Sequence, residues 1–93
     1  PSVKEYADIL MAGVMEHRAA LDREIDGALE NWTPERVGRI ERNILRIALF
    51  EMRHRHDVPR NAAISEAVEI AKRYGSDEAP RFVNGVLDRL KGD

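Results

Sequence analysis

The sequence predicts a single all-α domain over residues 1–93, folded as a bundle of four to five helices. Three observations predict it. Charged residues make up 34% of the chain and aromatic residues only 5%, a mixture that favours helices over strands. Apolar residues recur at steps of three and four in several segments. Residues typical of caps and turns separate these segments at short intervals.

The first segment predicts one long amphipathic helix over residues 3–30. Ser2 is a suitable N-cap, and Glu5 three residues later completes a capping box. Ile9, Met11 and Met15 lie to the sides of the apolar stripe, so this helix carries more apolar surface than one contact requires. The stripe itself consists of Val3, Tyr6, Ala7, Leu10, Val14, His17, Leu21, Ile25, Ala28 and Trp32.

Asn31-Trp32-Thr33-Pro34-Glu35 breaks this pattern, and Thr33 followed by Pro34 predicts a new turn or helix capped by Thr33. Gly38 is expected to mark a bend. The next helix is apolar over a wide arc, as a central helix should be, and ends near Arg53-His54-Arg55-His56. Its apolar residues are Val37, Ile40, Ile44, Leu45, Ile47, Ala48, Leu49 and Met52.

Two more helices complete the prediction. Pro59 is expected at the first position of one helix, and Gly75 just after its end. Ser76 or Asp77 is expected to cap the last helix, with Glu78 in its first turn. The expected buried faces are Ala63, Ile64, Ala67, Val68, Ala71 and Tyr74, then Ala79, Val83, Val86, Leu87 and Leu90.

The composition argues against an enzyme, a metal protein and a membrane protein. The chain contains no cysteine and no phosphate-binding or HExxH motif. His54 and His56 would point about 200° apart on a helix and cannot converge on one metal. His17 is expected to be a packed histidine. We therefore expect no cofactor, no membrane span and a cytoplasmic location, which the absence of cysteine also fits.

The basic residues are concentrated in the middle of the chain. Residues 33–60 hold seven arginines against four acids, whereas residues 1–32 hold three basic and seven acidic side chains. Arg39, Arg42, Arg46 and Arg53 fall on one side of a helix, and such a row can track a phosphate backbone. An ordinary solvated helix, neutralised by Glu35, Glu41, Glu51 and Asp57, explains the row equally well.

Helical geometry places Phe82 at the rim of the last helix's buried face. Arg89 falls beside it, and Gly85 leaves a gap. A rim aromatic flanked by cations can stack an unpaired base, as single-stranded RNA recognition requires. A plain core role for Phe82 is the alternative, and Gly85 would then let the last two helices approach closely.

Several segments in order resemble the NusB family. They are Asn31-Trp32, residues 44–51, Asp57-Val58-Pro59, residues 66–72 and, most specifically, Phe82-Val83-Asn84-Gly85-Val86-Leu87-Asp88. Phe50 and Ser65 replace the family's usual Tyr and Asn. The resemblance implies a helical bundle that binds boxA-like single-stranded RNA together with a small-subunit ribosomal protein. That complex joins RNA polymerase for transcription antitermination.

The resemblance also implies roles for single residues. Glu78, Arg81 and Phe82 match the closing-helix part of the RNA surface. Together with the arginines above, the predicted RNA-binding set is Arg39, Arg42, Arg46, Glu78, Arg81, Phe82 and Arg89. Glu35 and Glu41 match acidic positions that face the ribosomal partner, and Arg36 between them is assigned to the same surface.

One departure from the family is large. The family's two N-terminal helices, the first of them arginine-rich, have no match here, so we expect weakened RNA binding and a homodimer through the uncovered face of helix 3–30. Two alternatives remain open. One is the NusB-like domain of ribosomal RNA cytosine methyltransferases, whose closing sequence is closer to FVNAVLRR. The other is a helical bundle that binds only proteins.

Overall fold

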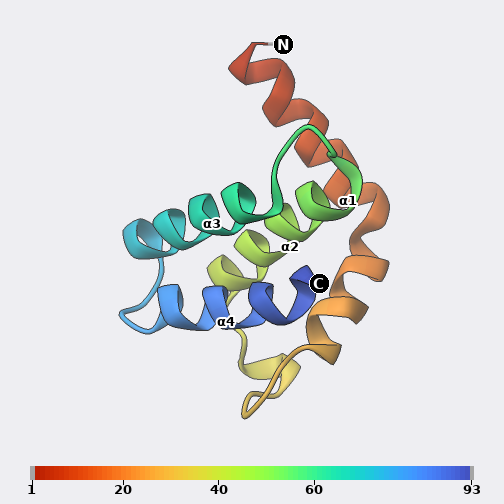
Figure 1. Cartoon of the computed structure of the whole chain (residues 1–93). Coiled ribbons are helices and arrows are strands. Elements are labelled where there is room, and N and C mark those ends of the chain that lie inside the picture. The colour runs from red at the N-terminus through yellow and green to blue at the C-terminus, as the bar shows by residue number, and fades with distance from the viewer. Residues whose placement is uncertain (1, 93) are drawn as a thin grey trace.

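The computed structural model describes residues 2–92 and consists of four helices with one 3₁₀ turn. The helices are α1 (Val3–Gly27), α2 (Arg39–His54), α3 (Arg60–Tyr74) and α4 (Ala79–Lys91), and the turn η1 spans Pro34–Arg36. No strand occurs within residues 2–92. α2, α3 and α4 pack against one another, and α1 lies along α2 (Figure 1). The all-α prediction is confirmed.

The start of α1 is as predicted, but its end is not. The Ser2 Oγ accepts a hydrogen bond from the Glu5 amide at 3.1 Å, and the Ser2 amide donates to the Glu5 carboxylate at 3.4 Å. These two bonds form the capping box. The helix ends at Gly27 rather than near residue 30, so Trp32 lies in the linker and not on the helical stripe.

The linker from residue 28 to residue 38 turns the chain back along α1. Asn31 adopts a left-handed conformation with φ of 57°, which asparagine tolerates better than most residues. Thr33 precedes η1 as predicted, but its side chain makes no capping hydrogen bond. Gly38 is the N-cap of α2, so the expected bend marks the start of the helix.

Three other predicted helix ends shift by one or two residues. Pro59 is the N-cap of α3 rather than its first residue. Gly75 is the C-cap of α3 in an extended conformation, not a left-handed residue beyond it. Glu78, rather than Ser76 or Asp77, occupies the N-cap of α4, and its side chain makes no capping bond. Ends shift easily because they carry few buried contacts.

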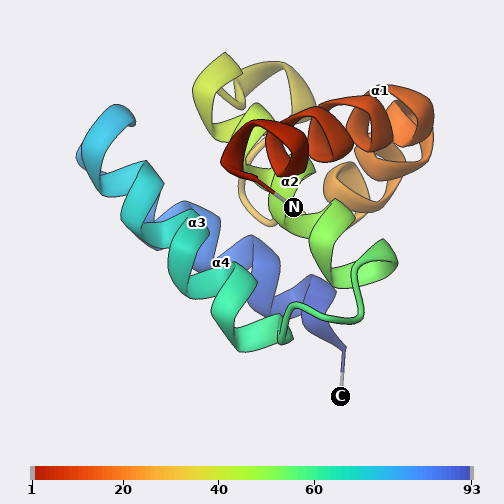
Figure 2. The same cartoon turned by 90° about the horizontal axis from the view of Figure 1, so that it is seen from above.

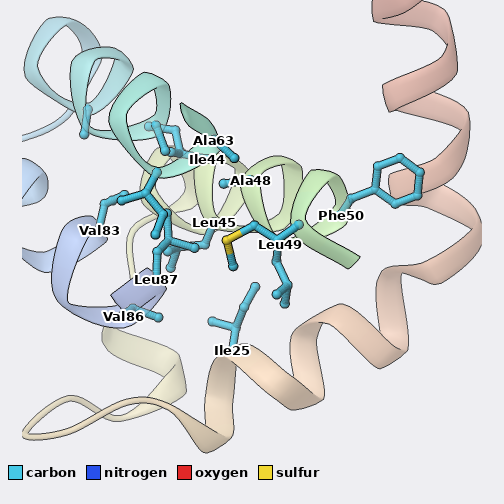
Figure 3. Packing of buried hydrophobic residues seen from close by; sticks show 14 of the residues in the cluster. Ile25, Ile44, Leu45, Ala48, Leu49, Phe50, Ala63, Val83, Val86 and Leu87 are labelled. Carbon is cyan, nitrogen blue, oxygen red and sulfur yellow. The ribbon is translucent and has the colours of Figure 1, made fainter. Parts of the chain in front are cut away.

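The core lies between α2, α3, α4 and the second half of α1, as Figure 3 shows. α2 is central, with Leu45 and Leu49 fully buried. Burying one such side chain stabilises the fold by about 1.5–3 kcal/mol. Of the residues predicted for the buried faces of α3 and α4, Val68 and Leu90 are only partly buried, and Tyr74 at the end of α3 is 63% exposed. The largest fully buried side chains are Leu21, Ile25, Leu45, Leu49, Val83, Val86 and Leu87.

A second contact joins α1 to the end of α2 through an aromatic cluster. Phe50 points away from the main core toward α1 (Figure 3), and its ring packs directly over Gly13, where a Cβ atom would overlap it. The imidazole of His17 stacks on that of His54 with ring centres 4.2 Å apart, and Phe50 lies 5.0 Å from His54. His17 is therefore a packed histidine, as predicted.

The first turns of α1 extend beyond the other helices (Figure 1), and in the view from above they lie in front of α2 (Figure 2). Val3 is 89% exposed, Met11 64% and Met15 71%. Gly13, Leu21 and Ile25 are the buried residues of this helix, and two of them belong to its second half. The apolar surface that the sequence leaves without a partner is thus exposed in the described part of the chain.

Candidate nucleic-acid interface

The arginine row of α2 faces the acidic side of α1. Arg46 donates from Nε and Nη2 to both carboxylate oxygens of Asp22, at 2.7 and 2.9 Å, and from Nη1 to Asn43 at 3.0 Å. This bidentate pair is the strongest geometry available to arginine and a carboxylate. The hydrogen bond from Arg46 holds the pKa of Asp22 below its usual value, although partial burial opposes that shift.

Two further arginines of the row are also engaged within the chain. Arg42 donates to Asp26 at 2.7 Å and to the carbonyl oxygen of Pro34 at 3.0 Å. Arg53 donates to Glu24 and to the carbonyl oxygen of Leu90, the latter at 2.7 Å. The partners are thus acids of α1 and backbone oxygens, not the nearby acids of residues 33–60.

These contacts weigh against a phosphate track along α2. The side chains of Arg42 and Arg46 are each only 13% exposed, and a phosphate would have to displace a carboxylate that is already in place. Arg39, at the start of α2, is exposed and makes no ion pair with the residues that the structure describes. That Arg42 and Arg46 contact RNA stays a prediction without geometric support.

The last helix, α4, and the linker between α1 and α2 together form a different surface, which carries two aromatic rings. Phe82 is half-buried, as its predicted rim position requires. Its ring centre lies 5.6 Å from that of Trp32, and the two ring planes are inclined by 59°. Trp32 is 42% exposed. The pair has the tilted geometry that aromatic rings favour, so one ring does not cover the face of the other.

A hollow of about 270 Å³ borders the pair. Glu41, one of the predicted partner-binding residues, lines it and accepts a hydrogen bond from the Ser76 amide at 3.4 Å. Gly38 and Gly75 leave room for this carboxylate, because a Cβ atom at either position would crowd it. The lining residues are Trp32, Arg36, Val37, Gly38, Glu41, Ser76, Glu78, Ala79 and Phe82. Glu35 is not among them.

A second hollow of about 330 Å³ also borders the pair. It brings together four of the predicted RNA-binding residues: Glu78, Arg81, Phe82 and Arg89. Glu30, Asn31, Trp32 and Gly85 complete the lining. Trp32, Glu78 and Phe82 border both hollows. The two predicted surfaces therefore meet at one aromatic pair.

Arg89 makes contacts within the chain, and Gly85 does not have the packing role that was the alternative for it. The Arg89 Nε donates to the carbonyl oxygen of Ala28 at 2.7 Å, and its Nη1 lies 3.5 Å from Glu30. Arg89 thus ties α4 to the linker that carries Trp32. Gly85 does not bring α3 and α4 together, because an added Cβ atom there would meet only the Arg89 guanidinium, at 3.6 Å.

Trp32 is the site residue that sequence reasoning missed. Its spacing from Ile25 and Ala28 suits the apolar stripe of the first helix, which made it look like a core residue. The available signal was its position next to Thr33-Pro34, where the helix must end. A large aromatic in a loop between helices is more exposed than one on a helical stripe.

A polar cluster lies at the opposite end of α2. Glu51 is 6% exposed, and its carboxylate accepts a hydrogen bond from the Tyr6 hydroxyl at 2.7 Å. Burial raises the pKa of Glu51, although the bond from Tyr6 opposes the shift. Burial and the neighbouring carboxylate raise the pKa of Tyr6 to about 12. This cluster holds α1 against α2 and lies outside the two hollows.

Two absences hold for residues 2–92. No group of three or more histidine, cysteine, aspartate or glutamate side chains is placed to hold a metal ion. No helix in this part of the chain is long and apolar enough to cross a membrane.

The chain matches known proteins over nearly its whole length. The model of the NusB family matches residues 1–91. The transcription antitermination protein NusB of Trichlorobacter lovleyi is 47% identical over 88 residues, which cover 95% of this chain and 62% of that protein. The protein of the same name from Sorangium cellulosum is 50% identical over 90 residues, covering 97% and 64%.

A solved structure of T. maritima NusB has the same fold, with a TM-score of 0.90 at 40% identity. The match covers 97% of this chain and 63% of that one. The chain therefore spans less than two thirds of the length of each of these three proteins.

Proposed function

The chain belongs to the NusB family, and from that premise we propose that it acts in transcription antitermination by binding boxA-like single-stranded RNA. In this proposal it binds the RNA together with a small-subunit ribosomal protein and joins the RNA polymerase complex in the cytoplasm. The relatives cited above carry the antitermination name, and no catalytic step is part of the proposal.

The observation that carries the RNA assignment is the second hollow. It combines an accessible aromatic ring, Phe82, with an exposed cation, Arg81, within one concave surface. Stacking on an aromatic ring accepts any base, and a cation beside it binds the phosphate that follows. Arg81 makes no ion pair with the residues that the structure describes, so its charge is available, unlike those of Arg42 and Arg46.

The first hollow is the proposed contact for the ribosomal protein. Arg36 and Glu41 line it, and Glu35 lies exposed on the same short turn as Arg36. A mixed pair of charges around an apolar floor is typical of a protein interface with a polar rim. The two ligands would then bind in two hollows that share the aromatic pair.

Fluorescence anisotropy with labelled RNA tests the RNA assignment. BoxA-like and scrambled RNA are titrated with the chain, with and without the ribosomal protein. We expect Phe82→Ala to weaken binding about tenfold, the effect of losing one stacked base, and Arg81→Ala to reduce the salt dependence by about one phosphate contact. Arg73→Ala, an exposed arginine on α3, is the matched control. Equal affinity of all three variants and the parent chain would refute the assignment.

The exposed apolar side of α1 supports a second proposal, a homodimer through this face. Met11 and Met15 are both more than 60% exposed, and burying such a patch is favourable at about 25 cal/mol per Å². Light scattering at high micromolar concentration is expected to give the dimer mass, and Met15→Glu the monomer mass. A monomer for the parent chain at that concentration would exclude the dimer.

A further inference from the structure

We propose that Trp32 is a second base-stacking residue, and that the hollow it shares with Phe82 receives one unpaired nucleobase against the indole ring. This inference rests on the proposed RNA function and adds to it a residue outside the closing helix. It assigns the base to the hollow lined by Asn31, Arg81 and Gly85.

The geometry of the two rings leaves a surface for the base. The 59° inclination and 5.6 Å separation place the Phe82 ring at an angle to the indole of Trp32 rather than flat over it. The indole remains 42% exposed where it borders this hollow. The hollow of about 330 Å³ has room for a flat base, since one water molecule occupies about 30 Å³.

The linker holds Trp32 in place before any ligand arrives. Before Trp32 in the chain, the carbonyl oxygen of Ala28 accepts a hydrogen bond from Arg89 at 2.7 Å. After Trp32, the carbonyl oxygen of Pro34 accepts one from Arg42 at 3.0 Å. Both arginines belong to helices of the core, so the linker is fixed at two points. A ring fixed in this way loses little conformational freedom on binding, which favours affinity. Arg89 and Arg42 are therefore positioning residues in this account.

Two arginines and two glutamates line the hollow beside the indole, and Arg81 is the cation available to a phosphate. Arg81 lines the same hollow as Trp32, is exposed and forms no ion pair within residues 2–92. A cation beside a stacked base binds the phosphate next to that base. Glu30 is near Arg89 at 3.5 Å, which reduces its repulsion of a phosphate.

Trp32 is the only tryptophan of the chain, so intrinsic fluorescence reports on this ring alone. A short single-stranded RNA of boxA-like sequence is titrated while two signals are recorded, the anisotropy of the labelled RNA and the tryptophan emission. We expect the emission to be quenched along the same curve as the anisotropy, because a stacked base quenches indole. Inorganic polyphosphate, which carries charge but no bases, is expected to leave the emission unchanged.

Each outcome decides between the two proposals. RNA binding without quenching overturns the stacking by Trp32 and leaves the proposed function standing. Quenching by polyphosphate equal to that by RNA also overturns it, because no base is then needed. Absence of RNA binding, with and without the ribosomal protein, overturns both.

Variants separate stacking from folding. Trp32→Ala is expected to weaken RNA binding about tenfold and Trp32→Phe by a smaller factor, since phenylalanine keeps a ring. Tyr74→Ala removes an exposed aromatic at the end of α3 that lines neither hollow, and is expected to leave the affinity unchanged. If Trp32→Ala lowers the thermal midpoint of unfolding, the RNA affinities of Trp32→Phe and Trp32→Leu are compared instead, because only the first keeps an aromatic ring. Equal affinity of these two would show that the ring is not required.

Discussion

Replacing Gly13 by alanine sets two effects against each other. Alanine in a helix interior is about 1 kcal/mol more favourable than glycine. The added Cβ atom, however, would overlap three atoms of the Phe50 ring. That ring is 6% exposed and packs against His54 and His17, so it has little room to move.

We expect the overlap to prevail. Forcing an extra carbon into a packed site costs about 1–3 kcal/mol, and a rigid ring held on both sides lies toward the upper end. Subtracting the gain in helix propensity leaves a net loss of about 1–2 kcal/mol. For a domain of this size each kcal/mol lowers the thermal midpoint by about 4–8 °C.

Urea unfolding followed by circular dichroism measures the change. Gly27→Ala is the matched control, because a Cβ atom at this position in the same helix meets nothing within 4 Å; it is expected to be as stable as the parent chain or more so. Adding Phe50→Leu to Gly13→Ala should cost less than the sum of the two single changes. A Gly13→Ala variant at least as stable as the parent would refute the reasoning.

Three predictions concern ionisable groups. In a Tyr74→Phe variant, the remaining phenol of Tyr6 is expected to titrate near 12 because burial and the Glu51 carboxylate raise its pKa. The stability that the protonated phenol contributes is present below about pH 10 and lost as the pH rises toward 12. A midpoint near pH 10 in the phenolate absorbance would contradict the raised pKa. The pKa of Asp22 is lowered by Arg46, so its contribution to stability is present at neutral pH and lost as the pH falls below about 4. Asp22→Asn should reduce this acid sensitivity, and unfolding curves with unchanged pH dependence would show that the pair does not act this way. The pKa of Glu51 is raised by burial, so its ionised carboxylate lowers the stability of the fold instead of adding to it. Glu51→Gln should therefore be more stable than the parent at pH 7, and the difference should shrink toward about pH 4, where the carboxylate becomes protonated. A difference that does not vary with pH would count against that cause.

The arginine row shows what a sequence pattern can and cannot predict. Its helical spacing correctly places Arg42, Arg46 and Arg53 on one side of α2. The acidic excess of residues 1–32 was also visible in the sequence. The arginines and these acids form ion pairs only because α1 lies along α2, and periodicity does not predict how two helices pack. The opposite charges of the two segments therefore hold α1 against α2.

The closing helix was easier to predict because its periodicity is unambiguous. Val83, Val86 and Leu87 are buried, and Phe82 lies at the rim, as helical geometry requires. The other half of the aromatic pair could not be found in this way. Trp32 reaches Phe82 only because α1 ends at Gly27 and the linker folds back, and helix ends are poorly determined by sequence. The helices were thus predictable, whereas the contact between linker and closing helix was not.

The central claim is that RNA binds at the aromatic hollow and not along the arginine row of α2. Two-dimensional NMR of the isotope-labelled chain during titration with boxA-like RNA tests it most directly. The largest shifts are expected for the indole N–H of Trp32 and the amides of residues 81–85, while the Nε–H signals of Arg42 and Arg46 stay in place. Shifts concentrated on those two arginines, with the Trp32 indole unmoved, would contradict the account.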